Sequence, residues 1–143
     1  KDMLDKAKKY PFEKLICQDL EQSLNVKDRY FDVVMLIGAM EFIRNPYRLF
    51  RQVNRKIKDQ GIFLVTVPKR LPKHTKLIIK NYTKNEIEKI FLKAGFNIIE
   101  LKSFLGYYKQ VEKKKEIVGY SAYLLKKKMF WKNLTDIGKS SKI

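Results

Sequence analysis

The feature that most constrains the fold is a pair of short apolar runs, rich in β-branched residues, with one amphipathic segment between them. The runs are FDVVMLIG at residues 31–38 and IFLVTVP at residues 62–68. Continuous apolar runs of this length are typical of strands that are buried on both faces of a parallel sheet. Between them, residues 49, 50, 53 and 57 are apolar and follow helical spacing. The segments therefore predict a strand, a helix and a second strand parallel to the first.

Local signals mark both ends of this helix. Asn45 is a favoured N-cap residue, and Pro46 suits the first helical position, where its missing N–H is not needed. The sequence KDQG at residues 58–61 predicts that the helix ends in a turn, with Gly61 in a left-handed conformation.

The rest of the chain adds further helices and strands. A short helix at residues 2–10 ends before Pro11, and a capping box at residues 83–86, TKNE, opens a second long helix that closes at Gly95. The apolar side chains expected on its inner face are Ile87, Ile90, Phe91 and Ala94. Further strands are expected at residues 13–19, 96–104 and 116–128. The last two have no helix between them and should pair antiparallel, so the chain is expected to be α/β with a mostly parallel sheet and an antiparallel last strand.

The composition fits one folded domain in a reducing compartment. The chain has 143 residues, of which 45% are hydrophobic, enough for a core. No apolar run reaches the roughly 18–20 residues that span a bilayer. A single cysteine, Cys17, excludes an internal disulfide and favours a cytoplasmic location. Because Cys17 lies in an expected strand, we expect it to be buried as a small hydrophobic side chain.

The net charge of +17 has two interpretations that the sequence leaves open. Such a charge attracts nucleic acid, acidic membranes or anionic substrates. However, the 26 lysines far outnumber the 6 arginines and are spread along the chain, which is typical of A/T-rich coding sequence. The charge is therefore either a compositional bias or a functional basic face.

Taken in order, the motifs resemble those of the class I S-adenosylmethionine-dependent methyltransferases of the type 11 group. KDMLDKAKK at residues 1–9 resembles the helix after the family's second strand, and CQDLEQS at residues 17–23 resembles the acidic turn after its third strand. Residues 30–68 resemble the fourth strand, its loop, the next helix and the fifth strand, and residues 82–104 resemble the late helix and sixth strand. The resemblance implies that residues 1–128 are the carboxyl-terminal part of a single Rossmann-like methyltransferase domain and that residues 129–143 are a polar tail.

One part of the family pattern has no counterpart in this sequence. The family carries a glycine-rich loop after its first strand and an acidic residue at the end of its second, but no G-x-G occurs here. The family's sheet order is third, second, first, fourth, fifth, seventh, sixth strand. With the first two strands absent, a gap of roughly 14 Å is expected beside residues 31–36, at ~4.8 Å per strand step. We expect this chain to be the carboxyl-terminal part of a longer protein; strands lent by another chain, or a rearranged pairing, are the alternatives.

The resemblance implies a site for S-adenosylmethionine as cofactor. Asp19 matches a carboxylate that accepts a hydrogen bond from the adenine amino group, and the backbone amide of Leu20 matches a donor to a ring nitrogen. Met3 matches an apolar residue that lies against the adenine. The alternatives are that Asp19 only caps a turn and that Met3 only packs its helix.

The end of the first long apolar run would form the other side of that site. Leu36, Ile37 and Gly38 match the end of the family's fourth strand beside the cofactor, although Gly38 also suits a tight strand exit. Glu41 stands where relatives face the methyl acceptor, so it could orient the acceptor or act as a base, or be a solvated loop residue. Phe42 is expected to pack against the helix.

Other candidates carry weaker signals. His74, the sole histidine, lies in the irregular basic segment at residues 69–81, and Tyr107 and Tyr108 could line an acceptor pocket or simply pack. No metal-ligand spacing, nucleophile triad or phosphate-binding loop is visible. The sequence thus predicts methyl transfer to an unidentified acceptor; a non-catalytic methyltransferase-like subunit and a basic RNA-binding or RNA-methylating module are the alternatives.

Overall fold

The computed structural model describes residues 2–69, 80–109 and 115–128. His74 and the expected tail at residues 129–143 lie outside the described residues. The elements in chain order are α1 (Asp2–Ala7), β1 (Phe31–Leu36), the 3₁₀-helix η1 (Met40–Phe42), α2 (Pro46–Lys56), β2 (Ile57–Pro68), α3 (Lys84–Lys93), β3 (Phe96–Lys109) and β4 (Lys115–Lys127).

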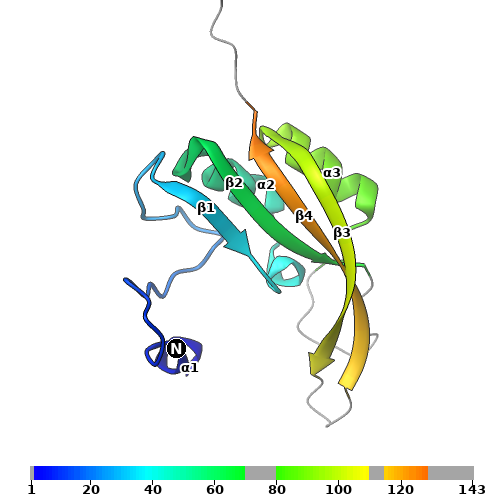
Figure 1. Cartoon of the computed structure of the whole chain (residues 1–143), viewed down its shortest axis with the longest axis horizontal. Helices are drawn as coiled ribbons and strands as arrows, with labels where there is room; N and C mark the ends of the chain where they lie inside the picture. Colours follow the sequence, from blue (N-terminus) through cyan, green and yellow to red (C-terminus); the bar gives the residue numbers. More distant parts are fainter. Residues whose placement is uncertain (1, 70–79, 110–114, 129–143) are drawn as a thin grey trace, which may run out of the picture.

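The four strands form one mixed sheet in the order β1-β2-β4-β3 (Figure 1). β1 pairs parallel with β2, and β4 pairs antiparallel with both of its neighbours. Three strands therefore run in one direction and only the last runs against them, as the sequence predicts. The order also matches the fourth, fifth, seventh and sixth strands of the family pattern, so the expected Rossmann-like α/β fold is confirmed.

The core lies between the sheet and two helices that cover the same face of it (Figure 1). Five elements each contribute one buried aromatic ring, with neighbouring ring centroids 5.0–5.5 Å apart. These rings are Phe50, Phe63, Phe91, Phe96 and Tyr123, from α2, β2, α3, β3 and β4 respectively. Burial of each such side chain contributes about 1.5–3 kcal/mol, so the five rings hold the elements together.

The predicted helix boundaries are largely confirmed. The Asn45 side chain accepts a hydrogen bond of 3.0 Å from the Arg48 amide at the start of α2. At the start of α3, the Thr83 hydroxyl and the Glu86 carboxylate form both hydrogen bonds of the capping box. Gly95 follows α3 with a φ of +88°, which only glycine adopts without strain.

The end of α2 differs from the prediction. β2 begins at Ile57 without a KDQG turn, and Gly61 is not in the left-handed region. A Cβ at Gly61 would lie 2.5 Å from Ile57 Cγ1 and 3.0 Å from the Asp32 and Lys58 carbonyl oxygens. Glycine is therefore required here because neighbouring backbone comes close, and the left-handed assignment of Gly61 is wrong.

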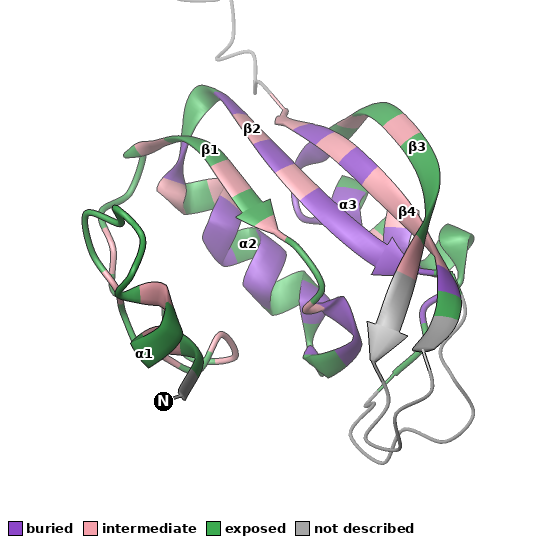
Figure 2. Ribbon diagram, turned by 60° about the horizontal axis from the view of Figure 1, so that its bottom comes forward, coloured by how far each residue is buried: buried purple, intermediate pink, exposed green. Residues whose placement is uncertain are grey.

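The expectation that β1 is buried on both faces is also wrong. Val34 and Leu36 pack toward the core, but Val33 and Met35 on the opposite face are 53% and 66% exposed. The helices α2 and α3 cover the core face, and the other face of β1 is largely exposed in Figure 2. β1 is also an edge strand, with β2 as its one neighbour among the described strands.

Residues 13–19 do not form the expected strand. They have no regular structure, and Cys17 is exposed, contrary to the prediction that it is buried. A strand requires a ladder partner, and these residues have none in the described part of the chain. A hollow of about 660 Å³ separates residues 13–16 from Tyr30 and Phe31. This hollow lies between the two segments where the sequence predicts a gap.

Candidate functional site

The chain turns sharply where β1 ends. Gly38 has a φ of +62°, and its amide donates a 2.9 Å hydrogen bond to the hydroxyl of buried Thr66 on β2. A Cβ at Gly38 would meet nothing within 4 Å, so its backbone can be approached closely from outside. Of the residues before it, Leu36 packs against the core and Ile37 is exposed. The turn places the next residues beyond the carboxyl end of the strand.

Glu41 is buried in η1, directly after this turn. The side chain is 2% exposed, and among the described residues its Oε2 atom has no hydrogen-bond partner. A buried polar atom left without a partner costs about 1–3 kcal/mol. Directly after η1, the Ile43 carbonyl oxygen accepts a 2.9 Å hydrogen bond from the buried Tyr82 hydroxyl. This bond fixes the carboxyl end of η1. Glu41 is therefore a buried carboxyl group with one oxygen that receives no hydrogen bond from the described residues.

Asp19 forms a turn and stays accessible. Its Oδ1 atom accepts a 2.9 Å hydrogen bond from the Glu21 amide, so the turn-capping interpretation describes what Asp19 does in the free chain. The side chain is exposed, whereas Leu20 is half-buried and packs against the core. One amide does not use up the acceptor capacity of a carboxylate, so Asp19 can accept a further hydrogen bond.

Two residues missed by sequence reasoning join the Asp19 turn to the loop after Glu41. The Glu21 carboxylate accepts hydrogen bonds from the Arg44 amide and, at 3.2 Å, from the Asn45 amide. Buried Gln52 on α2 accepts from the Leu24 amide at 2.7 Å and donates to the Gln22 carbonyl oxygen at 2.9 Å. A polar residue on the apolar face of a predicted helix was the signal for Gln52. The turn at residues 19–22 is thus fixed beside the loop at residues 38–45.

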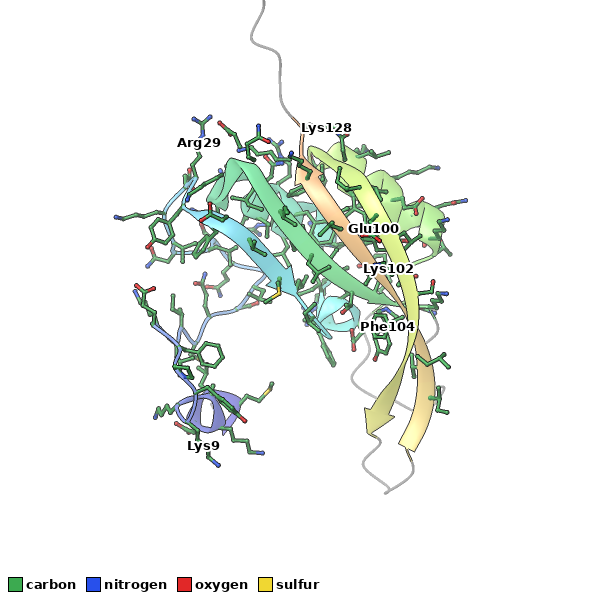
Figure 3. The ribbon with its side chains drawn as sticks, viewed as in Figure 1. Lys9, Arg29, Glu100, Lys102, Phe104 and Lys128 are labelled. Carbon is green, nitrogen blue, oxygen red and sulfur yellow. The ribbon has the colours of Figure 1, made fainter. Side chains whose placement is uncertain are left out.

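The structure does not place the other predicted site residues beside the loop at residues 38–45. Met3 is 84% exposed on α1, which lies apart from the sheet together with Lys9 (Figure 3). Phe42 is 41% exposed and does not pack fully against the helix. The side chains of Tyr107 and Tyr108 are outside the described part, and no group of three or more metal-ligating side chains occurs within it.

Two buried tyrosines near the carboxyl end of β2 remain protonated at neutral pH. Burial, with the negative charges of Glu21 and Glu86, raises the pKa of Tyr82. Burial, with the charge and hydrogen bond of Glu88, raises the pKa of Tyr123 to about 12. Both rings line a cavity of about 350 Å³ between α3 and the sheet. At neutral pH each of these two tyrosines therefore keeps a hydroxyl group that can donate a hydrogen bond.

Comparison with known proteins identifies the fold. Residues 1–65 match the model of the family described as methyltransferase domain. A methyltransferase candidate from Bacillus halodurans C-125 aligns over 90% of this chain and 77% of its own, with a TM-score of 0.66 and 14% identity. The chain has the fold of a class I methyltransferase. The fold expected from the sequence motifs is thereby confirmed.

Two more solved structures show how widely this fold is used. The 1,6-didemethyltoxoflavin-N1-methyltransferase of Burkholderia thailandensis, solved with S-adenosylhomocysteine bound, aligns over 90% of this chain with a TM-score of 0.62 and 10% identity. The [4+2]-cyclase SpnF aligns over 80% of this chain with a TM-score of 0.60 and 16% identity. The chain spans only 57% and 56% of these two proteins. Because one of them is a cyclase, the class I methyltransferase fold alone does not fix the reaction.

No curated protein matches the chain in sequence. No helix in the described part is long and apolar enough to cross a membrane.

Proposed function

We propose that the intact protein transfers a methyl group from S-adenosylmethionine to an acceptor, and that this chain supplies the adenine-binding turn and the acceptor side of the cleft. The observation that carries the proposal is the buried Glu41 carboxyl group with an unpartnered oxygen, three residues after the Gly38 turn. Both lie beyond the carboxyl end of β1, the edge at which open α/β sheets bind ligands.

The residues near this edge fit part of the cofactor. The exposed Asp19 carboxylate would accept the adenine amino group, and the Leu20 amide would donate to a ring nitrogen. Leu36 and Ile37 would line the cofactor beside Gly38, where the open space above the backbone admits a close approach. Met3 would contribute only after α1 moves closer than it lies here. The glycine-rich loop and the ribose-binding acid of the family would come from strands outside this sequence.

Methyl transfer from S-adenosylmethionine requires little acid–base catalysis by the protein. The bound cofactor supplies a methyl sulfonium with a neutral leaving group. The protein must mainly hold an acceptor atom in line with the methyl group. Glu41 would accept a hydrogen bond from an N–H or O–H of the acceptor and take its proton as the acceptor is methylated. Burial keeps water from competing for that carboxyl group.

The assignment of Asp19 is tested by Asp19→Ala in the full-length enzyme. Loss of one adenine hydrogen bond should raise the KM for S-adenosylmethionine about 3- to 10-fold and change kcat less. Asp32→Ala is the matched control, because Asp32 is also an exposed carboxylate and pairs with Lys58 at 2.8 Å. An unchanged KM in Asp19→Ala, with an intact fold by circular dichroism, would leave only the turn-capping role.

A second candidate is a methyltransferase-like subunit without catalytic activity. The two candidates share the fold of this chain and differ in whether S-adenosylmethionine binds. Calorimetric titration of the full-length protein separates the two candidates. Binding of S-adenosylmethionine supports the enzyme, whereas a tight complex with a partner protein and no heat from the cofactor supports the subunit.

A further inference from the structure

The arginines of this chain are concentrated on one helix. Four of the 6 arginines lie in or just before α2, although lysine outnumbers arginine by 26 to 6 along the whole sequence. We call these residues, Arg44, Arg48, Arg51 and Arg55, the arginine face. Arg48, Arg51 and Arg55 are spaced by three and four residues and lie within an arc of about 60° on the helix, and Arg44 precedes its N-cap. A compositional bias toward lysine does not produce such a cluster of arginine.

The arginine face points away from the core. The buried residues of α2 include Leu49, Phe50 and Val53, which lie on the opposite side of the helix by the same periodicity. All four arginines are exposed. Three of them line a hollow of about 310 Å³ on the surface, together with Ser23, Tyr47 and Gln52. The guanidinium groups thus border a concave surface that a ligand can enter.

The guanidinium groups of the arginine face form no ion pair with any acid in the described part of the chain. Seven of the eight ion pairs there use lysine, and the eighth joins Arg29 to Asp59 at the amino end of the β1–β2 pair (Figure 3). Of the acids near Ser23 in the sequence, Glu21 accepts hydrogen bonds from the Arg44 and Asn45 amides, and Asp28 pairs with Lys56 at 2.7 Å. The arginines therefore present unpaired charge to the solvent.

The chemistry of this surface fits a nucleic-acid backbone. A guanidinium fork binds phosphate oxygens in a bidentate manner, which a lysine ammonium cannot do. From Arg48 to Arg55 the helix rises about 10 Å, so the three guanidinium groups can contact more than one phosphate of the same strand. Tyr47 is 45% exposed at the same hollow and offers a ring on which a base can stack. We propose that the arginine face binds the phosphate backbone of RNA, independently of methyl transfer.

The test measures binding of the full-length protein to a fluorescein-labelled 12-nucleotide oligouridylate by anisotropy, between 50 and 200 mM salt. The variant R48Q/R51Q/R55Q should bind roughly 30-fold more weakly and lower the slope of log affinity against log salt by about 2, for three lost phosphate contacts on a single strand. The matched control is K84Q/K89Q/K93Q, which removes three exposed charges from α3. We expect this control to bind within about 3-fold of the unmodified protein, because its charges act only at long range.

Three outcomes would overturn the proposal. Equal losses in the arginine and lysine triple variants would show that the charge acts diffusely. Unchanged binding in R48K/R51K/R55K would show that no guanidinium fork is used. Tighter binding of a polyglutamate peptide than of the oligouridylate would assign the face to an acidic protein. Circular dichroism checks that each variant folds, which the exposure of all the substituted side chains favours.

Discussion

At the scale of single residues, two glycines serve opposite purposes. Gly38 has a left-handed φ with open space around it, whereas Gly61 has an ordinary conformation with backbone close by. Gly38→Ala should therefore cost about 1–2 kcal/mol through conformational strain alone. Gly61→Ala should cost more, because the new methyl group would push β1 and β2 apart. Urea unfolding of both variants measures the difference, and a larger loss in Gly38→Ala would contradict this explanation.

Glu41 gives a second prediction at this scale. Its unpartnered oxygen destabilises the free protein, so Glu41→Gln, which replaces that oxygen by a neutral amide, should raise the free energy of unfolding by about 1 kcal/mol. If Glu41 is the base, the same variant should lower kcat by about 100-fold and leave the KM for S-adenosylmethionine nearly unchanged. Thermal unfolding and steady-state kinetics test both effects. Loss of stability together with unchanged kcat would make Glu41 an ordinary structural residue.

Residues whose role depends on their sequence neighbours were predictable, and those that depend on neighbours in space were not. Asn45, the capping box at residues 83–86 and Gly95 satisfy backbone groups within a few positions, so their spacing reveals them. Gly61 is crowded by the Asp32 carbonyl oxygen, 29 positions away, and no local pattern shows this contact. The burial of Glu41 likewise follows from how η1 packs.

At the scale of elements, α2 connects the core to the Asp19 turn through Gln52. Gln52→Leu would leave the Leu24 amide and the Gln22 carbonyl oxygen without their partner, at about 1–3 kcal/mol for each group that water does not reach. Hydrogen exchange should accelerate at residues 19–28 and stay unchanged in α3. Arg51→Gln, one position away on the exposed face, is the control and should leave exchange at residues 19–28 unaltered. Equal acceleration in both variants would contradict the role of Gln52.

The capping box of α3 predicts a dependence on pH. Hydrogen bonds from the Thr83 amide and hydroxyl lower the pKa of Glu86 below its ordinary value of 4.5. A lowered folded-state pKa means that the stabilisation is fully present above about pH 4.5 and is lost as the pH falls through the folded value. The thermal midpoint should therefore fall more steeply below pH 4.5 in the unmodified protein than in Glu86→Gln. Parallel pH profiles for the two proteins would show that other carboxylates dominate.

The same scale explains the strand that was predicted but not found. Residues 13–19 have the composition of a strand, but a strand is stabilised by the backbone of its neighbour rather than by its own sequence. β1 and β2 form as predicted because their backbones pair with each other. The cofactor residues beside the missing ladder, Asp19 and Leu20, therefore remain predictions from the resemblance.

At the scale of the whole molecule, β1 exposes both an apolar face and the outer edge of the sheet. Val33 and Met35 expose apolar surface on β1, and the outer edge of β1 has no partner among the described strands. Such edges pair with other chains, so the 143-residue chain should self-associate as its concentration rises. Val33→Lys with Met35→Lys should reduce this association in sedimentation velocity. Leu105→Lys, on exposed surface of β3, is the control. An equal reduction by the control would mean that the contact is not at β1.

The overall topology could be predicted because it follows from the order of strands and helices. The prediction did not extend to which face of the sheet stays open, because the apolar run of β1 is the same whether or not anything covers it. The arginine face was also missed, since a helical arc of exposed charge becomes visible only when α2 is known to bury its other side.

The position of β1 at the edge of the sheet affects the order of the candidate site that follows it. Gly38 and Glu41 follow β1, an edge strand with one hydrogen-bonded neighbour among the described strands, so local opening at this edge should disorder both residues together. A strand that pairs with β1 would stop this fraying. Part of the free energy of its docking would then order the loop at residues 38–45. The pairing of a further strand with β1 and the ordering of the loop that holds Gly38 and Glu41 would then be governed by the same equilibrium.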